Sequence, residues 1–190
     1  MRAAAALLAA LCGGSLLAAG SGTADRGNSQ DCGVAWAWTG ALGPDGVVIK
    51  ARLTCADALP ASVEALVWPE ADGADAPSAL RFPARSVGPH RMAAFDVQGL
   101  QPRTAYKFRV ASTAGRGPEA VGAFATPGPL KEPQSFSLGF ASCADNHSNS
   151  VIFDVIREHK PLFFFHTGDL HYGNVEVNDT ELFHEMYDQV

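Results

Sequence analysis

The chain has little positive charge and no basic cluster. It contains 14 lysines and arginines against 20 aspartates and glutamates in 190 residues, which gives a formal net charge of −6. Nucleic acids and anionic membrane surfaces are bound through clustered positive charge, so neither is an expected partner. Long apolar runs are also lacking beyond the N-terminus, and we therefore expect no membrane span once that segment is removed.

The one long apolar run opens the chain. Met1-Arg2 is followed by an alanine- and leucine-rich stretch to Ala19, and small residues continue to Ala24. A positive start, a short apolar stretch and a small-residue cleavage site predict a signal peptide over residues 1–24. A retained anchor fits less well, because the run is short, is interrupted by glycines and has no charged stop after it. We therefore expect secretion to the cell exterior or to a periplasm-like compartment.

Cysteine is scarce, and its count is informative. Removal of the signal peptide takes Cys12 with it and leaves Cys32, Cys55 and Cys143. In an oxidising compartment Cys32 and Cys55 are expected to pair, which would contribute about 3 kcal/mol by closing a short loop. Cys143 is then unpaired. Taken alone, such a residue fits a small buried apolar side chain.

Residues 25–127 are predicted to form a β-sandwich. About seven short alternating segments separated by turn residues indicate antiparallel strands. Leu100, Pro102, Thr104 and Tyr106 are similar to the tyrosine corner of immunoglobulin-like folds, and the segment resembles a fibronectin type III module. Tyr106 and the tryptophans are accordingly expected in the core or the corner rather than in a ligand platform.

Residues 128–134 are a predicted linker. In residues 135–190 the spacing of the apolar residues changes from that of short antiparallel strands to that of alternating strands and helices. A short apolar strand, a helix, the apolar run Leu162–Phe165 and a second helix opened by Asn178 follow in order. The apolar run suits a strand buried on both faces of a parallel sheet. Two parallel strands with bare edges do not make a stable sheet. Either the chain is an incomplete fragment of a longer protein, which we expect, or a partner completes the sheet.

Three side chains with metal-binding chemistry follow these two strands. Cys143 comes after the first strand, and Asp169 and Tyr172 come after the second. Ligands of open α/β sheets bind outside the carboxyl ends of the strands, so the three side chains are expected to meet. A thiolate, a carboxylate and a phenolate together favour iron(III) over structural zinc. Bridging by Asp169 to a second ion such as calcium, zinc or magnesium would be natural.

The segments Gly139-Phe-Ala-Ser-Cys143 and Gly168-Asp169-Leu-His-Tyr172-Gly-Asn resemble the start of a PhoD-like (alkaline phosphatase D) metallophosphatase domain, within the calcineurin-like phosphoesterases. The resemblance implies that residues 135–190 are a partial domain of this kind and that the substrate is a phosphate ester. It implies that Cys143, Asp169 and Tyr172 are iron ligands and that Asp169 also serves catalysis by touching the second metal. The family's further ligands come from later strands, so this length of chain is not expected to turn over substrate.

Other candidates and an alternative function remain open. Asp145 and His147 form an Asp-x-His pair that is either a ligand pair or a polar loop capping the helix. His171 and Asn174 are candidate hydrogen-bond partners of the ligands or contacts to substrate, or exposed loop residues. His166, inside the apolar strand, is expected to be a core histidine with a satisfied hydrogen bond. The alternative to an enzyme is a secreted, non-catalytic binding module that uses the sandwich surface to recognise a partner or a glycan.

Overall fold

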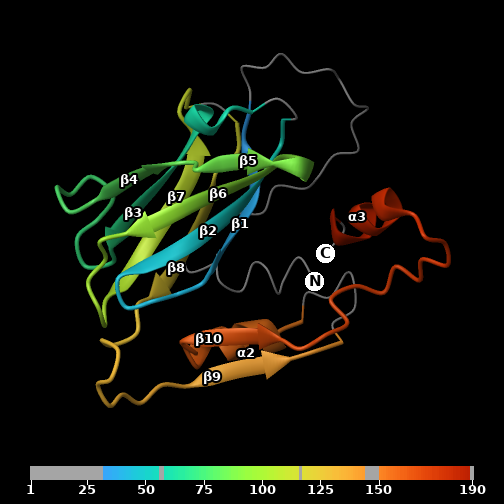
Figure 1. Ribbon diagram of the computed structural model, residues 1–190. Coiled ribbons are helices and arrows are strands. Elements are labelled where there is room, and N and C mark those ends of the chain that lie inside the picture. Colours follow the sequence, from blue (N-terminus) through green and yellow to red (C-terminus); the bar gives the residue numbers. More distant parts are fainter. Residues whose placement is uncertain (1–31, 56–57, 116, 144–149, 189–190) are drawn as a thin grey trace. The chain divides into compact units, whose positions relative to one another are not determined.

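The structure is a computed structural model that describes residues 32–188, with gaps at 56–57, 116 and 144–149. The predicted signal peptide, Asp145 and His147 therefore lie outside the described residues. The described chain forms two compact units, the first ending at Glu132 and the second beginning at Pro133 (Figure 1). Within the described ranges, no helix is long and apolar enough to cross a membrane.

The first unit is an antiparallel β-sandwich, as predicted. One sheet has the order β1-β2-β6-β5 and the other the order β4-β3-β7-β8 (Figure 1). The strands are β1 (Val34–Gly40), β2 (Gly46–Leu53), β3 (Val63–Pro69), β4 (Leu80–Pro83), β5 (Ser86–Gly88), β6 (Met92–Gln98), β7 (Ala105–Ser112) and β8 (Ala120–Ala125), with short 3-10 turns η1 (Pro60–Ser62) and η2 (Pro89–Arg91). The sequence did not predict β5, because three residues are too few to show an alternation.

The core lies between the two sheets and follows the alternation of the strands. On β2, every second residue from Val47 to Leu53 is buried, and Phe95 of β6 and Phe108 of β7 are fully buried against them. A period of two places one face of each strand inward, so these residues exclude water from both sheets at once. Cys32 and Cys55 are disulfide-bonded, as expected, and Cys32 belongs to this core.

The predicted tyrosine corner is present. Tyr106 is buried, and its phenol oxygen accepts a hydrogen bond from the backbone N–H of Gln101 at 2.8 Å. Its ring stacks on Phe124 with 5.5 Å between the ring centroids. The hydroxyl satisfies a donor in the bend that leads into β7, which ties this turn to the core.

The expectation that the tryptophans of β1 lie in the core is wrong. Ala37, between them, is buried, so Trp36 and Trp38 point to the other face of the strand, away from the core. A β-bulge between Val34 and Trp36 shifts the register of β1 against β2. The extra residue changes which side chains of the strand face inward.

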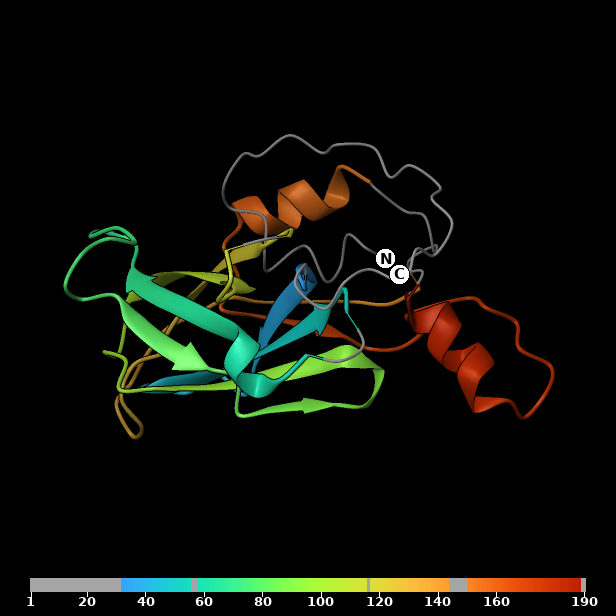
Figure 2. The same cartoon turned by 90° about the horizontal axis from the view of Figure 1, so that it is seen from above.

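The second unit contains β9 (Leu138–Ala141), α2 (Ile152–Glu158), β10 (Phe163–His166) and α3 (Thr180–Asp188). The two strands pair in parallel, with Phe163 opposite Leu138 and His166 opposite Ala141. Ile156 of α2 lies over Gly139 of β9, beside the ring of Phe164. The helix therefore covers one face of this two-stranded sheet (Figures 1 and 2).

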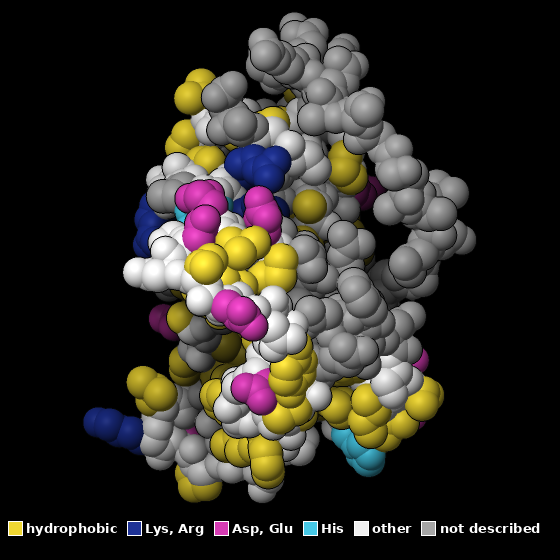
Figure 3. Space-filling view, turned by 90° about the vertical axis from the view of Figure 1, so that its right-hand side faces the viewer, with side chains coloured by type: hydrophobic (Ala, Val, Ile, Leu, Met, Phe, Trp, Pro, Cys, Tyr) yellow, Lys and Arg dark blue, Asp and Glu magenta, His cyan; other side chains and the backbone are white. Residues whose placement is uncertain are grey.

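Two expectations for this unit are wrong. The apolar run is not buried on both faces, since Phe165 of β10 and Phe140 opposite it are 53% and 71% exposed. Figure 3 shows hydrophobic side chains exposed on the surface of the molecule. The second helix is capped by Asp179 rather than Asn178, because Asp179 Oδ1 accepts the backbone N–H groups of Glu181 and Leu182.

Candidate metal centre

The loops that follow β9 and β10 are joined by backbone hydrogen bonds. Beyond the last paired residues, Thr167 N–H donates to the carbonyl of Ala141 at 2.8 Å, and Cys143 N–H donates to the carbonyl of Gly168 at 3.3 Å. The parallel ladder thus continues past the strand ends. These bonds hold Cys143 beside the residue that precedes Asp169, so two side chains that are 26 positions apart share one end of the sheet.

Two of the three candidate ligands, Cys143 and Asp169, have backbones in the left-handed region. The φ angles are 60° at Cys143 and 52° at Asp169, and Gly168 has a φ of 136°. Residues other than glycine adopt such angles at a cost of roughly 1–3 kcal/mol, and they cluster at functional sites where the surroundings enforce them. Gly168 has no Cβ to penalise its own angle. The positive φ of the residue before Asp169 therefore explains why that residue is a glycine.

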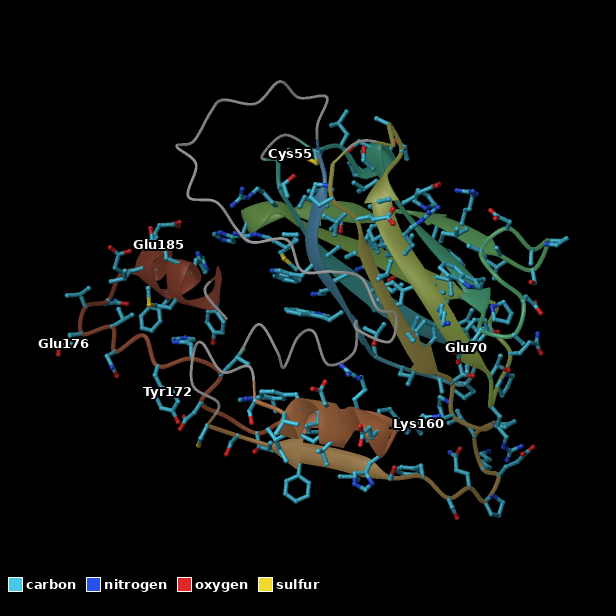
Figure 4. All side chains as sticks on the ribbon, turned by 180° about the vertical axis from the view of Figure 1, so that it is seen from behind. Cys55, Glu70, Lys160, Tyr172, Glu176 and Glu185 are labelled. Carbon is cyan, nitrogen blue, oxygen red and sulfur yellow. A yellow bond between two sulfur atoms is a disulfide. The ribbon has the colours of Figure 1, made fainter. Side chains whose placement is uncertain are left out.

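One carboxylate oxygen of Asp169 accepts hydrogen bonds from both Cys143 and Tyr172. The Cys143 thiol donates a hydrogen bond to Asp169 Oδ2 over 3.3 Å, and the Tyr172 hydroxyl donates to the same oxygen over 3.2 Å. Cys143 Sγ also lies 3.3 Å from Ser142 Oγ. All three side chains are exposed, and Tyr172 stands on the segment between β10 and α3 (Figure 4). The structure thus brings the three sequence-predicted ligands together.

The phenol of Tyr172 holds its proton more tightly than an ordinary tyrosine does. The hydrogen bond with Cys143 raises the pKa of the Tyr172 phenol well above its ordinary value, and partial desolvation and the charge of Asp169 act in the same direction. Each of these contacts favours the neutral phenol over the phenolate. A cation at this point would reverse the preference, because ligand oxygens and sulfurs bind metal in their deprotonated forms.

The donor set fits a metal ion by chemistry and by spacing. A thiol, a carboxylate and a phenol supply up to three negative charges, which suits a trivalent ion. Donor atoms that share one cation at bond lengths of about 2.0–2.3 Å lie about 3 Å from one another. The separations of 3.3 Å from Asp169 Oδ2 to Cys143 Sγ and 3.2 Å to Tyr172 Oη are close to that spacing. The three side chains require little movement to become ligands.

No protein-family model and no curated protein matches the sequence. Among solved structures, one of PhoD is similar over 74% of this chain and 27% of that chain, with 20% identity and a TM-score of 0.53. The likeness is one of fold. An fn3 domain of human contactin 1 (22% identity, 62% of this chain and 98% of that chain, TM-score 0.38) and the sensor domain of the anti-sigma factor RsgI4 of Pseudobacteroides cellulosolvens (13%, 55% and 96%, 0.37) also match.

Among the described residues, the other candidates form no hydrogen bond to Asp169 Oδ2. His171 Nδ1 accepts a hydrogen bond from the N–H of Gly173 at 3.2 Å, and its ring forms a T-shaped pair with that of Tyr187, with 4.6 Å between the ring centroids. His171 thereby connects the loop to α3. Asn174 is exposed, with a φ of 47°. His166 differs from its prediction, since its Nε2 is enclosed without a hydrogen-bond partner in the described chain.

Proposed function

We propose that the protein is an exported, metal-dependent phosphoric-ester hydrolase of the alkaline phosphatase D type. The observation that carries this proposal is the convergence of Cys143, Asp169 and Tyr172 at the ends of two parallel strands. The Gly-Asp-x-x-Tyr spacing of the second loop and the likeness in fold to PhoD support the reaction class. The disulfide of the first unit is compatible with an exported protein.

The three residues have two parts in this proposal. Cys143 and Tyr172 would hold iron(III), since both become anions and stabilise the higher oxidation state. Asp169 would hold the iron and also a second divalent ion, calcium first and zinc or magnesium as alternatives. When bound, such a pair supplies a Lewis acid that neutralises charge on a phosphoryl group and activates water. The exposed cluster leaves room for substrate to approach.

The proposal is tested by hydrolysis with the protein made from its complete coding sequence. p-Nitrophenyl phosphate and bis(p-nitrophenyl) phosphate are compared, with Asp169→Asn as the test variant and Glu176→Gln as the control. Glu176 is an exposed acid on the same segment (Figure 4). Loss of even an outer partner of a metal ligand lowers activity about 10–100-fold, so Asp169→Asn is expected to exceed that loss. The control should keep the parent rate.

Two results would contradict the proposal. One is a metal-replete parent protein that hydrolyses neither ester, and the other is an Asp169→Asn variant that is as active as its parent. The ratio of the two rates in an active parent reports monoester or diester preference. Export is tested separately, since the secreted protein is expected to begin at Asp25, after the predicted cleavage site.

A further inference from the structure

A pair of stacked tryptophans stands on the outer face of the sandwich. Trp36 and Trp38 follow one another on the outward side of β1, with ring centroids 4.6 Å apart and an interplanar angle of 18°. β1 is an edge strand of its sheet. Trp38 is 36% exposed although it is one of the largest apolar side chains. Tryptophans that lie at a surface with a rigid mutual geometry are typical of recognition sites.

The sequence leaves one face of this pair open. Gly40 is the next residue on the same side of β1, and a Cβ placed on it would meet no atom of the described residues within 4 Å. Trp36 stacks on one face of the Trp38 ring, and Gly40 is the next outward position of β1 beyond Trp38. Val48 lies across from Gly40 on β2 and forms the apolar floor beside it. The ring of Trp38 therefore stands next to Gly40, a position without a side chain. A ligand ring about as wide as the indole could lie there against Trp38.

Positive charge lies next to the aromatic pair. Lys50 is directly across from Trp38 and Arg52 directly across from Trp36, and both point outward from β2. Lys50 is exposed and forms no salt bridge in the described part of the chain, whereas Arg85, further along this sheet, is paired with Asp96. Arg52 is oriented by a hydrogen bond from Nη1 to the carbonyl of His90. An anionic group on the ligand would therefore find a cation beside the ring wall.

We propose that this face binds an anionic sugar ring of a glycan, with the C–H face of the ring on Trp38 and its carboxylate or sulfate at Lys50. A pyranose ring has one face of C–H groups and a polar rim, which matches an aromatic wall bordered by a cation. Single-stranded nucleic acid also stacks on aromatic rings, but it is held by tracks of basic residues and weakened by an acidic protein. Two cations in a chain of net charge −6 do not form such a track.

The other sheet contains a matched control. Trp68 of β3 lies across from Lys107 of β7, so the same pair of residue types occurs there. Lys107 is, however, in a salt bridge with Glu70 at 3.4 Å, and the next residue after Trp68 is a proline. Trp68 has neither a stacked partner on its strand nor a glycine beside it. The proposal predicts that Trp68 does not contribute to binding.

The test is a titration followed by tryptophan emission. The probes are a galacturonic acid hexasaccharide and a sulfated hexasaccharide with the same number of rings. Three comparison ligands represent the other classes: an uncharged glucose hexasaccharide, octadeoxythymidylate and an octaglutamate peptide. One of the two anionic sugars is expected to change the emission saturably and to bind at least about tenfold more tightly than the uncharged one, since one charge-assisted contact is sufficient for that ratio. The sugar arms distinguish a carboxylate from a sulfate ligand.

Variants then test whether the sugar binds at Trp38, Gly40 and Lys50. Trp38→Ala and Gly40→Val should each weaken the anionic sugar about tenfold, because stacking on an aromatic ring accounts for roughly that factor. Lys50→Gln should remove the preference for the charged sugar, and Trp68→Ala should bind like the parent. Gly40→Val keeps every aromatic ring, so its effect does not depend on the folding of a tryptophan variant.

Three results would overturn the proposal. They are no saturable response to either anionic sugar, equal binding by the Gly40→Val variant and the parent, and tighter binding of the oligonucleotide or the acidic peptide than of both sugars. The proposal concerns the first unit alone and does not rest on the metal centre. The titration therefore tests the sugar site, and the ester-hydrolysis assay tests the metal centre, whatever the outcome of the other.

Discussion

Removal of the Cys32–Cys55 disulfide is expected to destabilise the sandwich by about 3 kcal/mol. The two cysteines are 23 residues apart, and the value follows from the entropy that the closed loop removes from the unfolded chain. Cys32 is also part of the core, so the Cys32→Ala/Cys55→Ala variant loses two sulfur atoms from a packed region. For a unit of about 100 residues, the midpoint of thermal unfolding should fall by about 12–24 °C.

Tryptophan emission can follow this unfolding transition without interference from the second unit. All three tryptophans of the chain, Trp36, Trp38 and Trp68, lie in the first unit. Protein is produced through an oxidising compartment, and the parent is measured before and after reduction. Reduction breaks the crosslink and keeps both sulfur atoms, so the difference between reduced parent and variant isolates the packing effect.

Cys143→Ala is the matched control, since it removes a cysteine of the second unit and should leave the emission midpoint unchanged. Thiol titration of the denatured chain without residues 1–24 should find one free thiol, that of Cys143. A reduced parent that melts within about 3 °C of the oxidised one would show that the loop-closure argument does not apply here. Three free thiols would contradict the disulfide itself.

Three further predictions concern single contacts. Tyr106→Phe should lower the stability of the sandwich by about 1–3 kcal/mol, because the N–H of Gln101 loses its acceptor; tryptophan emission on heating measures this, and an unchanged midpoint would contradict it. In metal-free protein, the absorbance of Tyr172, taken as the difference from Tyr172→Phe, should titrate above the ordinary tyrosine value of about 10, and Cys143→Ala should bring it back down because that hydrogen bond is the main cause of the shift. Since the folded-state pKa is the higher one, the stabilisation is complete below pH 10 and is lost as the pH rises toward the folded-state pKa. Asp179→Ala should reduce the helicity of α3 and cost about 0.5–2 kcal/mol locally, whereas Asn178→Ala should have little effect; equal effects in circular dichroism would contradict the cap.

The sandwich could be predicted from sequence because its signals are local. The alternation on β2 and β7 identifies the core face, and the spacing up to Tyr106 identifies the corner. The outward position of Trp38 could not be predicted, since it depends on a bulge that shifts which residues of β1 face inward. Large apolar side chains are usually assigned to a core, and a bulge has no sequence signature that overrides this assignment.

The candidate site was predictable for a different reason. Parallel pairing fixes which strand ends are neighbours, so Cys143 and Asp169 could be placed together from topology alone. The left-handed backbone at both residues and the hydrogen bond from Cys143 to Gly168 could not, because they are properties of the folded loops. The predicted capping residue of α3, Asn178, lies one position before the observed cap, Asp179. Asn178 and Asp179 are both good caps, and only the path of the loop decides between them.

Iron content and visible absorbance of the protein made from its complete coding sequence test whether Cys143, Asp169 and Tyr172 bind a metal ion. A phenolate bound to iron(III) absorbs visible light by charge transfer, so the parent protein is expected to be coloured and to contain iron. Tyr172→Phe should lose the band, Cys143→Ala should lose most of the iron, and Glu176→Gln should resemble the parent. An iron-free parent, or a Cys143→Ala variant that retains both iron and colour, would contradict the assignment of Cys143, Asp169 and Tyr172 as metal ligands.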